Sequence, residues 1–198
     1  MKIVETVDVV SAGSFPRGKH WEKAYKDVRA AVEGTDWPHG SGRFSIRPEK
    51  HGNGVVPIKT LCLSKLNSLG WEIEALPELE EHVLTPGDLD ALLKTDQGPV
   101  GFEWETGNIS SSHRALNRLL LALYRGNIRG GFLVVPSAKL YQYLTDRIGN
   151  ITELRPYLPL WRALPVENGI LRIIVVEHDA EDKRAKRIPK GTSGRARR

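Results

Sequence analysis

The segment Gly101–Asn108, with the sequence Gly-Phe-Glu-Trp-Glu-Thr-Gly-Asn, places the tightest constraint on how this chain can fold. Side chains on a strand alternate between its two faces, so Glu103 and Glu105 project together. Phe102 and Trp104 project to the opposite face. One face therefore packs into a core while the other presents paired carboxylates. The residues that follow favour a helix, so the segment predicts a strand that leads directly into a helix start.

Helices and strands are expected to alternate along the rest of the chain. Helices are expected where apolar residues recur at helical spacing, and strands where short runs are apolar or β-branched. The expected helices span residues 17–33, 57–69, 110–125 and 138–148, and the expected strands span residues 89–93, 100–106, 132–135 and 170–176. This order predicts an α/β fold with a central mixed β-sheet flanked by helices.

Basic residues are concentrated at the end of the sequence. Residues 183–198 contain eight basic residues and no acids, which leaves 21 bases and 24 acids in residues 1–182. We therefore expect a single α/β domain over residues 1–182 and a basic arm over residues 183–198 that contacts a polyanion. A solvated tail that only keeps the protein in solution is the alternative interpretation.

Acidic residues are concentrated in a second segment, residues 72–105, where ten acids surround the single base Lys94. Paired carboxylates on one strand face repel each other, and both ionise readily only if a cation lies between them. Asp88 and Glu74 are candidates for further oxygen ligands. An exposed strand face is the competing interpretation. Because the acidic strand runs into a helix start that carries Arg114, and such ends attract phosphate, the pattern favours a metal-dependent nuclease.

The compartment is indicated by what the sequence lacks. Cys62 is the only cysteine, so the chain has no internal disulfide framework. Glu5 and Asp8 interrupt the apolar N-terminus before a signal-peptide core can form. No apolar run approaches the roughly 18 residues that a membrane helix needs. We expect a cytoplasmic protein that does not enter a membrane.

Four sequence blocks resemble the BamHI family of type II restriction endonucleases. They are Asn53–Lys59, Gly101–Ser111 with His113 and Arg114, Tyr143–Arg147, and Ile188–Gly191. The resemblance implies a PD-(D/E)XK nuclease fold and a homodimer that encloses double-stranded DNA. It also implies Mg²⁺-dependent cleavage of the palindrome GGATCC after its first G, with 5′ overhangs and 5′-phosphates. A cognate DNA methyltransferase in the same prokaryotic restriction–modification system, without direct contact, is implied as well.

The resemblance also implies roles for individual residues. Asp88, Glu103, Glu105 and Glu74 match the catalytic carboxylates. The metal ligands would be Asp88, Glu103, Glu74 and the backbone carbonyl of Trp104, and Glu105 would act as the general base. Two Mg²⁺ ions per active site are implied, with Mn²⁺ or Ca²⁺ able to replace them for binding. Asp90 competes with Asp88 for its role, because the two share a face if Leu89 points into the core; Asp88 is preferred.

The positions that match the family's DNA contacts lie in four parts of the chain. They are Lys59, Asn108, Ser110, Arg114, Asp146, Arg147, Gly194 and Arg195. Arg is suited to guanine O6 and N7, Asn to adenine N6 and N7, and Asp to cytosine N4. A non-catalytic, sequence-specific DNA-binding protein is the alternative function. Such a protein would have no need of paired carboxylates beside its phosphate-binding surface.

Overall fold

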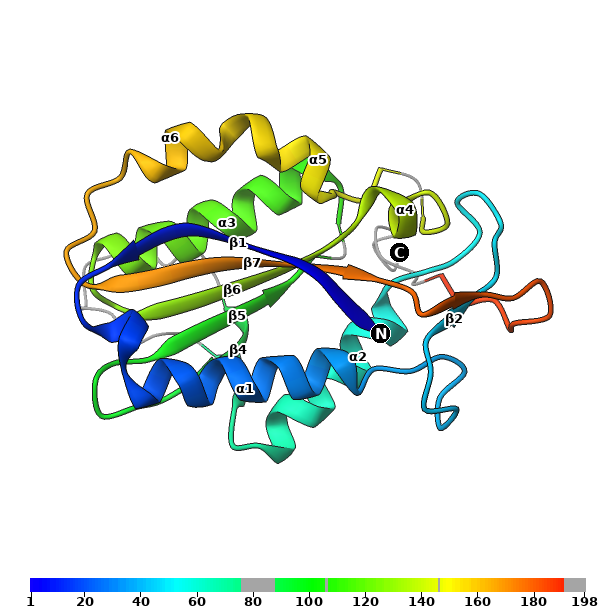
Figure 1. Ribbon diagram of the computed structural model, residues 1–198, viewed down its shortest axis with the longest axis horizontal. Coiled ribbons are helices and arrows are strands. Elements are labelled where there is room, and N and C mark those ends of the chain that lie inside the picture. Colours follow the sequence, from blue (N-terminus) through cyan, green and yellow to red (C-terminus); the bar gives the residue numbers. More distant parts are fainter. Residues whose placement is uncertain (76–87, 106, 146, 191–198) are drawn as a thin grey trace, which may run out of the picture.

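The computed structural model describes residues 1–75, 88–105, 107–145 and 147–190. A six-stranded sheet with the order β1-β7-β6-β5-β4-β3 forms its centre (Figure 1). Its strands are β1 (Lys2–Ala12), β3 (Glu72–Ala75), β4 (Leu89–Leu93), β5 (Val100–Trp104), β6 (Gly130–Pro136) and β7 (Gly169–Glu177). The three strands β5, β6 and β7 run parallel, whereas β1, β3 and β4 pair antiparallel. The predicted mixed sheet is confirmed.

Helices cover both faces of this sheet. In Figure 1, α1 and α2 lie on one side and α3, α5 and α6 lie on the other. The helical segments are η1 (Phe15–Arg17), α1 (Lys19–Glu33), α2 (Val56–Ser68), α3 (Ile109–Tyr124), α4 (Ala138–Tyr141), α5 (Ile151–Leu154), η2 (Arg155–Tyr157) and α6 (Leu158–Arg162). A small parallel pair, β2 (Ser45–Ile46) with β8 (Ala180–Glu181), lies apart from the main sheet. In the described ranges, no helix has the length and apolarity that a membrane crossing requires.

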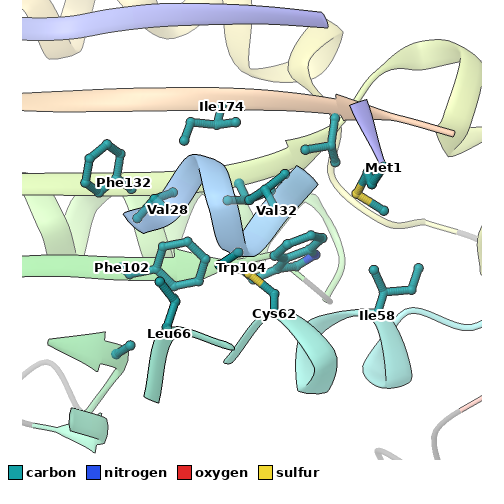
Figure 2. Close-up of a cluster of buried hydrophobic side chains, with 14 of the residues drawn as sticks. Met1, Val28, Val32, Ile58, Cys62, Leu66, Phe102, Trp104, Phe132 and Ile174 are labelled. Carbon is teal, nitrogen blue, oxygen red and sulfur yellow. The ribbon is translucent and has the colours of Figure 1, made fainter. Parts of the chain in front are cut away.

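The core on the α1 and α2 side fixes the orientation of β5. Phe102 and Trp104 are buried there with Val28 of α1 and Leu66 of α2 (Figure 2). The predicted alternation along β5 is thus confirmed for its two aromatic residues. Glu103 is consequently directed to the other face, where α3 packs, because neighbouring side chains on a strand point to opposite sides.

The strand β5 ends sooner than expected and α3 begins slightly earlier. Residue 105 is already outside the strand, and the helix starts at Ile109. Asn108 caps this helix, because its side-chain oxygen accepts a hydrogen bond of 3.1 Å from the Ser111 amide. Such a cap satisfies one of the unpaired N–H groups of a helix start. It holds the strand-to-helix junction in one position.

The expected helix over residues 138–148 is wrong in length, because α4 ends at Tyr141. The chain leaves the helix to form an isolated β-bridge between Leu144 and Asn53. The backbone amide of Asn53 donates to the carbonyl of Tyr143 over 3.0 Å. In a continuing helix, this carbonyl would instead accept from an amide of the same helix. A tertiary contact with a distant segment therefore overrides the local helical pattern.

Two strands of the six-stranded sheet, in addition to the small pair β2 and β8, are not among the strands expected from the sequence. One is β3, and the other is the long strand β1, which is the outermost strand beside β7. The register between β1 and β7 shifts twice, between Ile3 and Glu5 and between Asp8 and Val10. Each shift interrupts the alternation by which a strand is recognised in a sequence.

Candidate active site

Glu103 and Glu105 lie at the end of β5 and are largely shielded from solvent. Their residues are 6% and 5% exposed, respectively. The alternative of an exposed strand face is therefore excluded for both. Buried carboxylates require compensating partners, since an unpaired buried charge is costly.

A cavity of about 230 Å³ opens at these two residues. It lies where α2, β4, β5 and α3 approach one another. Its lining residues are Lys59, Asp90, Glu103, Trp104, Glu105, Gly107, Ser111, Arg114, Ala115 and Arg118. Three carboxylates and three basic side chains thus meet in one small hollow.

The carboxylate of Glu103 is paired with Arg118 of α3. The Arg118 Nη1 atom lies 3.1 Å from Glu103 Oε1 and also donates a hydrogen bond to the backbone carbonyl of Asp88. The guanidinium is close enough to neutralise the carboxylate, but its N–H groups are not aligned with it. Among the described residues, Glu103 Oε1 accepts no hydrogen bond and Arg118 Nε donates none. The pair therefore has charge balance but incomplete hydrogen bonding.

The carboxylate of Asp90 is held between a lysine and the backbone of the neighbouring strand. Its Oδ1 atom lies 2.5 Å from Lys59 Nζ, and its Oδ2 atom accepts a hydrogen bond of 2.8 Å from the Trp104 amide. Lys59 comes from α2 and Asp90 from β4, so this contact joins two elements across the cavity. Asp90 is thereby fixed beside Glu103.

The third carboxylate, Glu105, is fixed by the turn that follows it. Glu105 Oε1 accepts a hydrogen bond from the Gly107 amide, and the Glu105 amide donates to the Val134 carbonyl over 3.0 Å. A side chain at Gly107 would collide with Ser111, because an added Cβ would lie 2.6 Å from the Ser111 hydroxyl oxygen. Glycine therefore allows the turn to lie close against α3.

Burial perturbs the acidity of both glutamates. Burial, and after it the nearby Asp90 carboxylate, raise the pKa of Glu103, whereas Arg118 and Lys59 lower it, and the net result is a pKa of about 8. The pKa of Glu105 is also raised by burial, and the hydrogen bond from the Gly107 amide acts against this. A positive charge placed in the cavity would lower both pKa values.

The raised pKa of Glu103 makes stability depend on pH. Between its ordinary value of 4.5 and about 8, the folded protein keeps a proton that the unfolded chain has released. Stability is therefore lost as pH rises through this window. We expect the melting temperature of the protein in EDTA to fall relative to that of Glu103→Gln from about pH 5 to about pH 9. A difference between the two melting curves that stays constant over this range would contradict the assignment.

The cavity has the donor chemistry that a divalent cation requires. Carboxylate oxygens are preferred ligands of Mg²⁺, and one oxygen of Glu103 is without a hydrogen bond from the described residues. In the described part of the chain, however, no group of three or more His, Cys, Asp or Glu side chains converges as a ready-made metal site. Lys59 and Arg118 instead neutralise Asp90 and Glu103. A cation bound in the cavity would neutralise Asp90 and Glu103 in place of Lys59 and Arg118, and the carboxylates present fit such a cation.

The structure does not bring all of the expected carboxylates to the cavity. Asp88 is exposed, and only its backbone carbonyl is engaged there, by Arg118. Glu74 is exposed on β3 at a positive φ of 52° and does not line the cavity. Asp90 takes the place beside Glu103 that was expected for Asp88. The sequence indicates this difference, because Asp90 lies within the expected strand 89–93, whereas Asp88 lies before that strand.

Arg118 is not among the site residues expected from the sequence. It lies four positions after Arg114, so both project from the same side of α3. Both line the cavity. This spacing, read together with the acidic strand before it, was the signal that could have placed Arg118 beside Glu103.

Several of the expected DNA contacts lie around the start of α3. Asn108, Ser110 and Arg114 are exposed there, and Arg114 and Lys59 line the cavity. Arg147 is exposed and has a positive φ of 68°. The residue after it, Ile148, forms a β-bridge with Asn108, so this loop lies beside the helix start. Asp146, Gly194 and Arg195 lie outside the described residues.

The described part of the basic C-terminal segment begins on the body of the protein. Ala185 and Ile188 are buried, whereas the basic residues between them are exposed. The segment therefore follows the folded domain at least as far as Lys190.

Comparisons with known proteins point to one family. The family model described as "Restriction endonuclease BamHI" matches residues 1–195. The type II restriction enzyme OkrAI of Oceanobacter kriegii is 40% identical over 99% of both chains. The type II restriction enzyme BamHI of Bacillus amyloliquefaciens is 36% identical over 89% of this chain and 84% of its own.

Solved structures support the fold alone. The crystal structure of restriction endonuclease BglII complexed with a DNA 16-mer superposes with a TM-score of 0.65 at 12% identity, covering 95% of this chain and 88% of that one. Free BglII gives a TM-score of 0.53 at 9% identity, covering 90% and 81%. The sheet and its flanking helices are thus arranged as in these two enzymes.

Proposed function

The chain belongs to the BamHI family of type II restriction endonucleases, and on that basis we propose that it cleaves both strands of GGATCC after the first G in the presence of Mg²⁺. Members of this class are site-specific deoxyribonucleases, so the protein is a DNA-binding hydrolase. The observation that carries the proposal is the cavity at the end of β5, where buried Glu103 and Glu105 meet Asp90 beside the exposed start of α3.

The ligands that we propose for the cation are the carboxylates of Asp90 and Glu103 and the backbone carbonyl of Trp104. Asp90 replaces Asp88 in this set because its carboxylate, unlike that of Asp88, lines the cavity. One or two Mg²⁺ ions bound there would supply Lewis-acid stabilisation of the phosphate and lower the pKa of a bound water. Mn²⁺ or Ca²⁺ would replace Mg²⁺ in binding.

The protein groups have separate tasks in the proposed cleavage. Glu105 accepts the proton of the attacking water, and its position is set by the Gly107 amide. Arg114 faces the cavity from an exposed position and is suited to hold the scissile phosphate. Lys59 compensates Asp90 before the DNA and the cation arrive. Attack in line with the leaving 3′ oxygen yields the 5′-phosphate.

Base recognition is assigned to residues around the same helix start. Asn108, Ser110 and Arg114 lie on or before the first turns of α3, and the β-bridge from Asn108 to Ile148 brings Arg147 close to them. Asp146 is assigned to the same task from its place in the sequence alone. Arg, Asn and Asp together supply the partners that a G·C, G·C, A·T half-site offers in the major groove. Gly194 and Arg195 are proposed to contact the minor groove, where Arg binds favourably.

Arg147→Ala is expected to relax sequence selectivity. Loss of one bidentate contact to guanine costs about 1–3 kcal/mol of discrimination, which corresponds to roughly 5- to 150-fold. The measurement is the ratio of binding constants for GGATCC and for duplexes with one substituted base pair. Arg197→Ala in the basic arm is the control, and it should weaken all duplexes equally and lower the salt slope by about one unit. Equal weakening by Arg147→Ala would refute its role in base reading.

An even cut in both strands of a palindrome requires two active sites related by a two-fold axis. We propose that the second copy packs against the face formed by α3 and α6. Four of the exposed large apolar side chains lie there, on α3 and on the segment from η2 to α6: Leu121, Tyr124, Tyr157 and Leu160, which are 36%, 53%, 47% and 69% exposed. A cavity of about 710 Å³ lies on the same face, between α3 and Tyr157.

Leu160→Asp is expected to weaken the dimer at least about tenfold, because it places a charge where an apolar side chain would be buried. Sedimentation velocity over a range of protein concentrations measures the change. Val56→Asp is the matched control, because Val56 is 40% exposed at the start of α2, on the other side of the sheet. If both variants dimerise like the parent protein, the interface lies elsewhere.

Incubation with a sequenced plasmid tests the proposed reaction directly. The protein is incubated with Mg²⁺ and, in parallel, with excess EDTA, and the ends of any fragments are sequenced. Fragments that end within GGATCC only in the presence of Mg²⁺ are the expected result. A plasmid that stays intact but is retarded on a gel would instead favour the alternative function, a non-catalytic DNA-binding protein.

The proposed reaction also implies how the protein acts in its host. An endonuclease with this specificity cuts every unprotected site in the genome, so a cognate methyltransferase must modify the same sequence. No direct contact between the two proteins is needed. We therefore place the enzyme in a prokaryotic cytoplasm, within a restriction–modification system.

A further inference from the structure

A single buried amide connects two segments that are proposed to contact DNA. Asn53, just before α2, is 0% exposed. Its Nδ2 atom donates to the carbonyls of Arg47 and Tyr143, each over 3.0 Å, and its Oδ1 atom accepts from the Ile188 amide over 3.2 Å. Three segments that are far apart in the sequence thus share one side chain.

The backbone of Asn53 reinforces its contact with the loop before Arg147. Its amide donates to the Tyr143 carbonyl over 3.0 Å, and its carbonyl accepts from the Thr145 hydroxyl over 3.0 Å. Residues 143–145 are therefore tied to Asn53 by side-chain and main-chain hydrogen bonds. This loop leads directly to the residues proposed to read bases.

The next residue, Gly54, fixes the base of the C-terminal arm. Its amide donates to the Ile188 carbonyl over 2.9 Å. An added Cβ on Gly54 would lie 2.0 Å from the carbonyl oxygen of Pro189, so only glycine allows this approach. Ile188 is thus held at both its amide and its carbonyl, two residues before Lys190, where the described part of the chain ends.

We propose that Asn53 and Gly54 act as a clamp that couples the arm to the base-reading loop. The inference rests on the proposed function, since it takes Arg147 and Arg195 as DNA contacts. The backbone groups of Ile188 and Tyr143 both hydrogen-bond to the side-chain amide of Asn53. Movement of either segment therefore disturbs the hydrogen bonds that hold the other. Asn53 is therefore a positioning residue, through which correct docking of the arm favours correct docking of the loop.

A double-mutant cycle measures this coupling. Arg147→Ala and Arg195→Ala are made singly and together, first in the parent protein and then in Asn53→Ala. Binding to a GGATCC duplex and to an unrelated duplex is measured with Ca²⁺. In the parent protein, the combined loss of specific affinity should differ at least about threefold from the product of the single losses. In Asn53→Ala the two should agree within about twofold, as for independent sites.

Asn168→Ala is the matched control. The Asn168 Oδ1 atom also accepts a hydrogen bond from a distant backbone amide, that of Phe15, over 2.9 Å. Its loss should leave the coupling between Arg147 and Arg195 intact, which separates coupling from a general loss of stability. Where Asn53→Ala does not fold, Thr145→Val serves instead, because it removes only the hydrogen bond to the Asn53 carbonyl, and it should reduce the coupling.

The outcomes distinguish the clamp from the proposed function. A parent protein that binds both duplexes equally would overturn the proposed specificity. A parent protein that prefers GGATCC but shows additive losses would overturn the clamp alone. Coupling that persists unchanged in Asn53→Ala, or in Thr145→Val where that variant is used, would also overturn the clamp.

Discussion

Glu103→Ala is expected to abolish DNA cleavage while specific binding survives or becomes tighter. The change removes a carboxylate proposed to hold the cation that stabilises the phosphate, and loss of one such stabilising group costs at least about 100-fold in rate. With a cation bound, which lowers the pKa of Glu103, the change also removes a negative charge from a cavity that is proposed to lie against the DNA backbone, so repulsion of the phosphates decreases. Cleavage under single-turnover conditions and binding of the same duplex with Ca²⁺ measure the two effects.

Two further variants test whether the loss of cleavage is due to the charge of Glu103 and to its place in the cavity. Glu103→Gln keeps the shape of the side chain and should be as inactive as Glu103→Ala. Glu22→Ala removes an exposed carboxylate from α1, on the opposite side of the sheet, and should cut at the parent rate. Cleavage by Glu103→Gln at a substantial fraction of the parent rate would show that Glu103 is not a metal ligand.

Asp90→Asn and Asp88→Asn are expected to differ sharply. Asp90 lines the cavity and is fixed by Lys59 and the Trp104 amide, so its replacement should lower the cleavage rate at least about 100-fold. Asp88 contributes only its backbone carbonyl, which Asp88→Asn retains, so this variant should stay within about twofold of the parent. Each variant is the control for the other, because the chemical change is identical.

Single-turnover cleavage over a series of Mg²⁺ concentrations separates the two residues further. A variant that loses a metal ligand needs more Mg²⁺ to reach half of its maximal rate, whereas the other variant should follow the parent curve. The reverse order, with Asp88→Asn inactive and Asp90→Asn active, would restore Asp88 as the ligand.

Much of the sheet and of the site can be predicted from local sequence. The alternation over residues 100–105 correctly places Phe102 and Trp104 in the core, and this orientation directs Glu103 toward α3. The helix α3 begins at Ile109 because the side chain of Asn108 caps it. In both cases neighbouring residues decide the structure, so the pattern is sufficient.

The parts that could not be predicted depend on contacts between distant segments. The position of the Asp90 carboxylate in the cavity depends on Lys59, which approaches from α2. The end of α4 at Tyr141 depends on Asn53, far away in the sequence. Arg118 pairs with Glu103 only because β5 and α3 pack side by side. Periodicity in the sequence carries no information about these approaches.

The two register shifts in β1 bear on how the protein avoids aggregation. An outermost strand exposes backbone groups that can pair with the sheet of another molecule, and irregular, charged strands resist this. In β1 the irregularities coincide with Glu5 and Asp8, which form salt bridges with Arg155 and Arg172. Extension of the sheet from one molecule to the next is thereby disfavoured at this edge. The association proposed for the face of α3 and α6 would then meet little competition from sheet-to-sheet assembly along β1.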